Sequence, residues 1–259
     1  MKWEERKQKE QEYYEKQARR PLKEWGSDLD IEGFRPNALS SYKFLYEVAI
    51  PLCANKMVLD YGCGNGIHTP FLAKNSRKTV GIDLSSILLT MAEKRMEEKG
   101  LKGRAEFRVM DAENLDFPDD SFDVLFDGGT FSSLDLAKAL PEIVRILKPT
   151  GAVVGIETFG HNLVLNLKRK INTMTGKRTE WAASHIFQRE DIDLVRRYFS
   201  NIDLRYFHII SWMAFPFLKL PGGKALLRIL EWVDTMLARI SLLKNCAFKV
   251  VFVFSSPKK

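Results

Sequence analysis

The stretch from residue 58 to residue 66, Val-Leu-Asp-Tyr-Gly-Cys-Gly-Asn-Gly, constrains the fold of this chain more than any other. A short apolar run ends at Asp60, a glycine-rich turn follows, and the residues after it predict a helix over 66–75. Glycines let the backbone approach a ligand closely, and the first turn of a helix offers unpaired N–H groups. The order of strand, tight turn and helix therefore predicts a ligand-binding turn.

A second acid follows at a distance that such a turn requires. The next apolar run, residues 79–83, ends at Asp83, roughly 20 residues beyond the turn. A carboxylate at the tip of the second strand can accept hydrogen bonds from the two hydroxyls of a ribose. The first half of the chain is therefore predicted to bind a nucleoside.

The spacing of the glycines narrows the kind of nucleoside. A dinucleotide site has the pattern G-x-G-x-x-G, whereas this turn reads G-x-G-x-G from Gly62 to Gly66, with Asp60 two residues before it. An acid at that place would repel a pyrophosphate, and it would suit a cation such as the amino group of a methionine moiety. The pattern therefore disfavours a nicotinamide-dependent oxidoreductase.

Strands and helices are predicted to alternate over the first 160 residues. We expect strands near 57–61, 79–83, 105–110, 122–127 and 151–157, and helices near 66–75, 86–99 and 135–147. Such alternation predicts an α/β, doubly wound parallel sheet with right-handed crossovers. Ligands of these sheets lie beyond the carboxyl ends of the strands, and four acids are predicted to lie there: Asp60, Asp83, Asp111 and Asp127.

Three further stretches, residues 106–113, 115–126 and 146–154, complete a recognisable pattern. Together with the turn they resemble the class I S-adenosylmethionine-dependent methyltransferases of type 11, in the branch that includes the ubiquinone/menaquinone C-methyltransferases. The resemblance covers about residues 37–160. It implies a Rossmann-like sheet of seven strands, mostly parallel with an antiparallel last strand. It also implies S-adenosyl-L-methionine as cofactor and methyl transfer to a small or lipid-like acceptor by in-line displacement.

The resemblance also implies which residues bind the cofactor. Gly62, Cys63 and Gly64 would line the methionine and ribose, Asp60 would face the amino group, and Asp83 would hold the ribose hydroxyls. Asp111 and Ala112 would meet the adenine edge, and the backbone after Asp127 would close the pocket. The full set of cofactor-binding candidates is Asp60, Gly62, Cys63, Gly64, Gly66, Asp83, Leu84, Asp111, Ala112, Asp127 and Tyr14. The run 127–133 departs from many relatives, and it leaves the acceptor side of the pocket unspecified.

The two ends of the chain add candidate elements to one predicted domain over 1–259. Residues 1–36 are predicted to form a helical lid, from which Tyr14 would approach the adenosine. Residues 160–188 and 211–246 are predicted to be inserts on the acceptor side or facing a membrane, the second lying before the last strand. His185, in the first insert, is the candidate general base for an acceptor that starts protonated.

The insert over 211–246 contains a predicted helix over 224–243 with an unusually wide apolar face. A surface helix needs an apolar face only about 100° wide. Its own domain, a second subunit in a homodimer, an apolar acceptor or an anionic membrane could cover this face, and all four alternatives stay open. The charged residues within it exclude a helix that spans a bilayer.

Composition sets the remaining limits. The net charge is +7, which permits an anionic partner, but no aromatic-basic motif points to nucleic acid. Three separated cysteines predict neither a metal site nor a disulfide framework, and the charged start lacks an apolar leader, so we expect a cytoplasmic protein, at most peripheral at a membrane. A non-catalytic adenosylmethionine-binding protein remains the alternative to an enzyme.

Overall fold

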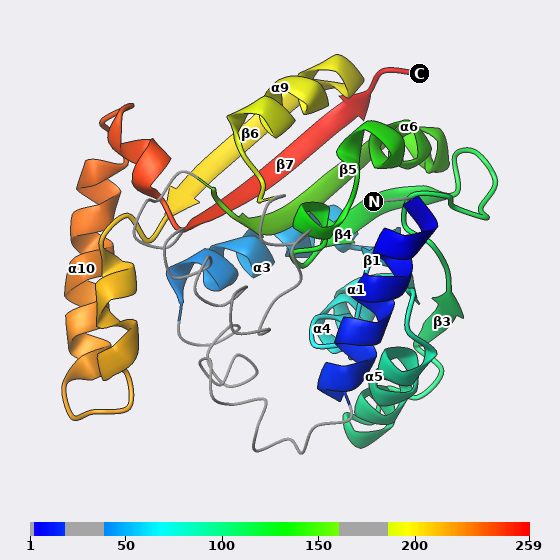
Figure 1. The fold of residues 1–259 in the computed structure, drawn as a ribbon, viewed down its shortest axis with the longest axis horizontal. Helices are drawn as coiled ribbons and strands as arrows, with labels where there is room; N and C mark the ends of the chain where they lie inside the picture. Colours follow the sequence, from blue (N-terminus) through cyan, green and yellow to red (C-terminus); the bar gives the residue numbers. More distant parts are fainter. Residues whose placement is uncertain (1–2, 19–38, 161–185) are drawn as a thin grey trace.

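The computed structural model describes residues 3–18, 39–160 and 186–259, and within them seven strands form one sheet (Figure 1). The order across the sheet is β3-β2-β1-β4-β5-β7-β6. The strands are β1 (Met57–Tyr61), β2 (Lys78–Asp83), β3 (Ala105–Val109), β4 (Phe122–Asp127), β5 (Leu147–Thr158), β6 (Phe199–Phe207) and β7 (Lys249–Pro257). The predicted seven-stranded α/β sheet is confirmed.

The first five strands are parallel, and β7 runs antiparallel to both of its neighbours, β5 and β6. Strands β1 and β4 are almost wholly buried, as expected of parallel strands covered on both faces. The predicted antiparallel last strand is therefore confirmed.

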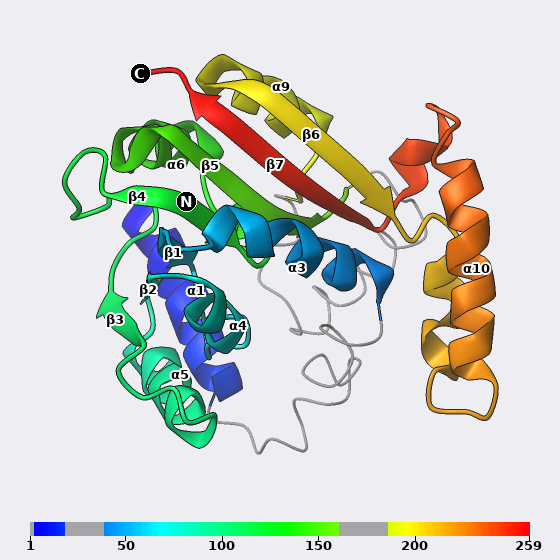
Figure 2. The same cartoon turned by 180° about the vertical axis from the view of Figure 1, so that it is seen from behind.

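Helices cover both faces of the sheet (Figures 1 and 2). On one face, α3 (Ser40–Cys53) and α4 (Thr69–Asn75) bury a cluster that includes Leu45, Leu72 and Phe126. On the other face, α6 (Leu136–Ile146) and α9 (Arg189–Tyr198) bury a second cluster. In α6 the buried residues recur at helical spacing: Leu136, Ala139, Leu140, Ile143 and Val144.

The remaining helices flank these layers. Helix α5 (Ser86–Glu98) packs on β2 and β3, and α1 (Trp3–Ala18) lies beside α5. Between β6 and β7 lie the 3-10 helix η3 (Ser211–Phe217), helix α10 (Gly223–Leu237) and η4 (Leu243–Cys246). The predicted helical insert before the last strand is confirmed. In the described ranges, no helix combines the length and apolarity that crossing a bilayer would require.

Several predicted boundaries are wrong by a few residues. Helix α4 begins at Thr69 rather than at 66, because Gly66 has a φ of +72° and cannot belong to a right-handed helix. Strand β5 begins at Leu147 rather than at 151, because Leu147 pairs with Phe122 across an irregularity in β4. Helix α10 ends at Leu237, and residues up to 243 form turns instead.

Candidate functional site

The candidate site lies at the topological switch point of the sheet. Strand β1 is followed in sequence by β2 on one side and pairs with β4 on its other side. Loops that leave the carboxyl ends of β1 and β4 therefore diverge, and they leave a crevice in which such sheets bind ligands. The loop after β1 is the glycine-rich turn, and the loop after β4 is the run 127–133.

The three glycines of the turn serve different purposes. All have positive φ, +66° at Gly62, +53° at Gly64 and +72° at Gly66. A Cβ at Gly62 would lie 2.4 Å from Thr130 Oγ1, and one at Gly66 would lie 2.7 Å from the Cβ of Ala92 in α5. A Cβ at Gly64 would meet open space. Gly62 and Gly66 therefore allow the loop to pack, while Gly64 presents bare backbone to the open side.

Asp83 ties the end of β2 to this turn. Its Oδ2 accepts a hydrogen bond from the Gly64 N–H at 3.0 Å, and its Oδ1 accepts one from the Ser85 N–H at 2.9 Å. Burial raises the pKa of this carboxyl, and the backbone hydrogen bonds oppose that shift. Each carboxylate oxygen has a second lone pair, so Asp83 can still accept hydrogen bonds from a ligand.

Asp60 lies at the end of β1 on the face covered by α3 and α4. It is 2% exposed, and its Oδ2 accepts a hydrogen bond from Thr69 Oγ1 at 2.6 Å. Burial raises the pKa of Asp60 to about 7, and the Thr69 hydrogen bond opposes the shift. The carboxyl is thus held at the base of the glycine turn, where a ligand cation would favour its ionised form.

The loop after β4 closes the other side of the crevice. Thr130 Oγ1 donates to the Tyr61 carbonyl at 2.9 Å, and its N–H donates to Asp127 Oδ1 at 2.8 Å. The run that departed from many relatives therefore locks against the glycine turn. This contact gives the run a structural role that the sequence did not indicate.

Two fully buried acids lie on the neighbouring strands β4 and β5. Asp127 ends β4, and Glu157 lies near the end of β5, where its Oε1 accepts from the Ser132 N–H at 2.9 Å. Burial, followed by the charge of Glu157, raises the pKa of Asp127 well above its usual value. Among the described residues, Asp127 Oδ2 has no hydrogen-bond partner. Burial and the neighbouring carboxylate thus both favour the neutral form of the Asp127 carboxyl.

Aromatic residues form a wall beside this acid. His68, at the start of α4, is buried, and its Nδ1 is 2.8 Å from the Tyr46 hydroxyl. Its ring stacks on Tyr42 at 6.0 Å between centroids. A Cβ at Gly128 would lie 2.7 Å from the His68 ring, so the backbone after β4 passes directly over the imidazole. These contacts give His68 a packing role in the wall.

The segment after β3 is clamped by the N-terminal helix. Lys7 forms an ion pair with Asp111, and Arg6 lies 2.5 Å from Glu113 Oε1. Asp111 Oδ1 accepts from the Glu113 N–H at 2.9 Å, and Tyr61 donates its hydroxyl proton to the Ala112 carbonyl. Helix α1 therefore lies against the residues that were expected to meet an adenine edge.

The other candidates are placed as follows. Tyr14 lies with its hydroxyl 3.5 Å from Ser133 Oγ, on the loop after β4, and Leu84 is half-buried beside Asp83. Cys63 is 7% exposed, and burial raises the pKa of its thiol well above its usual value, so it fills space rather than acting as a nucleophile. His185 and most of the insert 160–188, together with residues 19–36 of the lid, lie outside the described residues.

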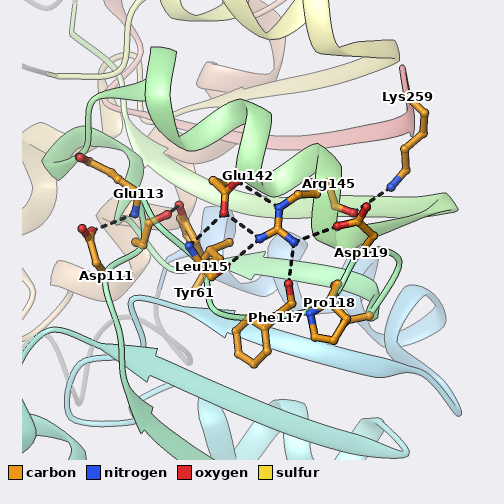
Figure 3. A network of polar contacts seen from close by, with 12 residues as sticks. Tyr61, Asp111, Glu113, Leu115, Phe117, Pro118, Asp119, Glu142, Arg145 and Lys259 are labelled. Atoms are coloured by element: carbon orange, nitrogen blue, oxygen red, sulfur yellow. Dashed lines mark hydrogen bonds and ion pairs between the residues drawn. The ribbon is translucent and has the colours of Figure 1, made fainter.

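A polar network that includes Arg145 holds the segment 111–119 (Figure 3). Arg145 of α6 donates to the Leu115 carbonyl at 2.7 Å and to the Phe117 carbonyl at 2.6 Å. The hydrogen bonds to Glu142 and Asp119 raise the pKa of the Arg145 guanidinium, so it is permanently charged. Arg145 thereby holds the loop that carries Asp111 and Glu113.

Sequence reasoning did not find four of these contributors. Thr130, Arg145 and the basic pair Arg6 and Lys7 act through partners far along the chain, and no local motif marks them. A fifth residue that sequence reasoning did not find is Lys249, the first residue of β7. It is buried, and its Nζ lies 3.1 Å from Thr158 Oγ1.

The residues present fit an adenosylmethionine. Gly64 offers exposed backbone, Asp83 retains lone pairs for a ribose, and Asp60 can face an amino group. In the parts of the chain that the structure describes, no group of His, Cys, Asp and Glu side chains is arranged to hold a metal ion.

Comparison with known families agrees with this geometry. Residues 59–155 match the family described as "Methyltransferase domain" (Methyltransf_11). That range begins in β1 and ends in β5, so it contains the glycine turn, Asp83, Asp111 and Asp127. The expected resemblance is confirmed over residues 59–155, which are similar to this family.

Curated relatives share this part of the chain. The demethylmenaquinone methyltransferase of Lactiplantibacillus plantarum is 36% identical over 113 residues, which are 42% of this chain and 48% of the relative. The phosphatidylethanolamine N-methyltransferase of Cereibacter sphaeroides is 34% identical over 106 residues, 40% of this chain and 52% of the relative. The chain thus spans about half the length of the curated relatives it matches.

Solved structures extend the likeness of the fold over more of the chain. The phosphoethanolamine N-methyltransferase 2 of Haemonchus contortus, crystallised with phosphomonomethylethanolamine and S-adenosylhomocysteine, aligns with a TM-score of 0.58 at 18% identity. The alignment covers 90% of this chain and 58% of the other. At this identity the match describes a shared fold alone.

Proposed function

We propose that this protein is an S-adenosylmethionine-dependent methyltransferase that acts on a small or lipid-like acceptor. One observation carries the proposal: the glycine turn at Gly64 and the carboxylate of Asp83 meet at the switch point of a methyltransferase domain. A bare backbone and a carboxylate that can still accept hydrogen bonds are what a ribose and a methionine tail require.

In this proposal the protein supplies alignment rather than covalent chemistry. The cofactor provides an activated methyl group on a sulfonium sulfur. Asp83 holds the ribose, Asp60 faces the amino group, and Asp111 with Ala112 borders the adenine. Helix α1, clamped by Arg6 and Lys7, covers this end of the crevice and excludes water from it.

The acceptor would enter over the carboxyl ends of β4 and β5. Burial and the charge of Glu157 raise the pKa of Asp127 there, and the Ser132 N–H donates a hydrogen bond to Glu157. A protonated carboxyl can donate a hydrogen bond to an oxygen of the acceptor and so orient it. His185 remains the predicted general base for an acceptor that must lose a proton.

The acceptor class rests on two supports. Relatives that share the domain are named for a demethylmenaquinone and for phosphatidylethanolamine, both apolar-tailed molecules. In addition, the insert over 211–246 carries exposed apolar side chains at the carboxyl edge of β6.

We place the protein in the cytoplasm, since all three cysteines are free thiols.

Calorimetric titration with S-adenosylhomocysteine tests cofactor binding. The wild type should bind, and Asp83→Ala should lose about 1.5–3 kcal/mol of binding free energy, as for hydrogen bonds to a charged group. Asp203→Ala is the matched control, because Asp203 is exposed on β6 and should bind as the wild type does. Equal affinity of Asp83→Ala and the control would remove Asp83 from the site, and an absence of binding by the wild type would refute the proposal.

Turnover separates an enzyme from a non-catalytic adenosylmethionine-binding protein. The protein is incubated with cofactor labelled in the methyl group and with demethylated quinols or phosphatidylethanolamine, and label is measured in the lipid extract. Transfer to either acceptor supports the enzyme. Tight binding of S-adenosylhomocysteine without transfer to any lipid or small-molecule fraction of the cell would favour the binding protein.

A further inference from the structure

Helix α10 turns an apolar stripe toward solvent. Leu226, Ile229, Trp232, Met236 and Ile240 follow one another at spacings of three and four, so they lie along one side of the helix and its C-terminal extension. Trp232 is 64% exposed and Ile229 is 60% exposed. Large apolar side chains at such spacing normally face a core, and here they face outward.

The same segment adds apolar side chains around this stripe. Met213, Phe217 and Leu220 project from η3 and the turn after it, and Leu242 is 75% exposed. Of the twelve large apolar residues exposed in the described chain, nine lie in 211–246. The exposure is therefore concentrated on one insert and is not a general property of the surface.

The opposite side of α10 packs against the domain, so the orientation of the helix is fixed and the apolar stripe faces outward. Leu227 joins Phe215 and Leu218 in the cluster under α3. Asp234 is 5% exposed and accepts from the Ile210 N–H at 2.8 Å, and Glu231 accepts from the Ser40 N–H at 2.9 Å. The two acids of the insert are thus both used for internal contacts.

The exposed charges that remain on the insert are all positive. Lys219, Lys224, Arg228 and Arg239 are exposed, and the helical spacing places Arg228 and Arg239 next to the apolar stripe. An outward face with large apolar residues, flanking cations and inward-turned acids is the arrangement of a helix that lies in the interface of an anionic bilayer.

A buried histidine fixes this insert next to the candidate site. His208, at the end of β6, has a φ of +59°, and its ring lies 2.9 Å from Ser41 Oγ and 2.8 Å from Ser211 Oγ. Ser41 lies in the first turn of α3, and the next residue, Tyr42, stacks on His68 at the wall of the crevice. In both views α10 stands at one end of the molecule, beyond the end of β6 (Figures 1 and 2).

We propose that the outward surface of residues 211–246 docks onto an anionic lipid bilayer. A second copy of the chain is a poorer occupant, because a two-fold interface centred on this stripe would place the cationic rims of two subunits against each other. In a bilayer with acidic headgroups, Trp232 can insert below the headgroups into an apolar environment, while Lys224 and Arg228 contact the negatively charged headgroups. Docking would hold the carboxyl edge of the sheet at the membrane, and this last step rests on the proposed function.

Sedimentation with vesicles tests the docking without cofactor or acceptor. The wild type should bind vesicles of phosphatidylcholine mixed with phosphatidylglycerol, and should bind phosphatidylcholine alone more weakly. Binding to the mixed vesicles should weaken with added salt, since screening shortens the reach of charges from about 10 Å at 0.1 M to about 3 Å at 1 M.

Two pairs of variants separate the apolar and the charged contributions. Ile229→Ser with Trp232→Ser should reduce partitioning by at least about tenfold, whereas Ile50→Ser on α3, also exposed, should not. Lys224→Gln with Arg228→Gln should reduce it about fivefold for each charge, whereas Lys94→Gln on α5 should not. Circular dichroism and calorimetry with S-adenosylhomocysteine should match the wild type for every variant.

The outcomes that overturn the proposal are distinct from a failure of the proposed function. No binding to the mixed vesicles would refute docking, as would a wild-type dimer in sedimentation equilibrium that Trp232→Ser converts to a monomer. Equal, salt-independent binding to neutral vesicles would refute the anionic partner. Vesicle binding by a protein that fails to bind S-adenosylhomocysteine would refute the methyltransferase and leave the docking surface standing.

Discussion

Replacement of Asp60 by asparagine should make the protein more stable at neutral pH while it weakens the cofactor site. Asparagine keeps an oxygen that can accept the Thr69 hydrogen bond, but it cannot ionise. The wild-type carboxyl has an ordinary pKa of 3.8 and a folded pKa of about 7, because burial penalises its charged form. The variant therefore removes a buried group whose ionisation opposes folding.

The sign and size follow from linkage. Between pH 3.8 and about 7 the folded protein keeps a proton that the unfolded chain has released, so the stability due to this group is complete below pH 3.8 and is lost as the pH rises through about 7. A difference of about 3 pH units corresponds to about 4 kcal/mol at 1.36 kcal/mol per unit. Asp60→Asn should thus match the wild type near pH 4 and exceed it by up to about 4 kcal/mol near pH 8.

Urea denaturation of both proteins across this pH range measures the difference directly. Groups other than Asp60 contribute equally to both proteins and cancel in the difference. Glu142→Gln is the control of opposite sign, since the Arg145 hydrogen bond lowers the pKa of Glu142. The stability due to that group is present above its ordinary pKa of 4.5 and is lost as the pH falls through the lowered value. A difference between Asp60→Asn and the wild type that stays constant or shrinks as the pH rises would refute the reasoning.

Two further substitutions test the turn and its support. Gly64→Ala should cost about 1 kcal/mol of unfolding free energy for its positive φ, and Gly62→Ala should cost more, because its Cβ would lie 2.4 Å from Thr130 Oγ1; equal losses in urea denaturation would contradict this difference. Arg145→Ala should lower the unfolding free energy by at least about 2 kcal/mol through its lost charged hydrogen bonds, whereas Arg197→Ala on the exposed side of α9 should change it little; similar melting temperatures of the two variants would contradict the role of the network.

The parallel half of the sheet could be predicted because its signals are local. Each strand is a short apolar run, and each acid at a strand end, such as Asp60 or Asp83, follows its own strand directly. The chain order of strands and helices then leaves few topologies. The glycine turn could be assigned to a ligand for the same reason, because its strand, its glycines and its helix are consecutive in the chain.

The closing contacts of the site could not be predicted, because they join distant residues. Lys7 and Asp111 are 104 positions apart, and Thr130 and Tyr61 are 69 apart. No local sequence motif marks either pair. The chain contains many lysines, aspartates and threonines, and the sequence alone does not show which of them meet in the fold. The helix boundaries failed for a related reason, as the end of α10 at Leu237 depends on the turn packing rather than on the apolar period.

The orientation of α10 shows the limit of periodicity most clearly. The residues Lys224, Arg228, Glu231, Thr235 and Arg239 read as one polar stripe that should face solvent. In the structure four of these residues are exposed as expected, but Glu231 accepts a hydrogen bond from the Ser40 N–H, 191 positions away. The apolar side chains of Ile229 and Trp232 are exposed as well. The apolar period of a helix identifies its apolar face, and only tertiary contacts decide how much of that face is buried.

The position of β7 between β5 and β6 has a consequence for how the chain is made. Strand β6 is hydrogen-bonded to β7 alone, and β7 follows the apolar insert in sequence. While the chain emerges from the ribosome, β5 keeps an open edge and β6 has no partner until the final strand arrives. The apolar insert therefore leaves the ribosome before β7 completes the sheet. A nascent chain stalled between residues 207 and 249 would therefore present an unpaired strand edge and an apolar helix together, the combination that recruits chaperones or begins aggregation.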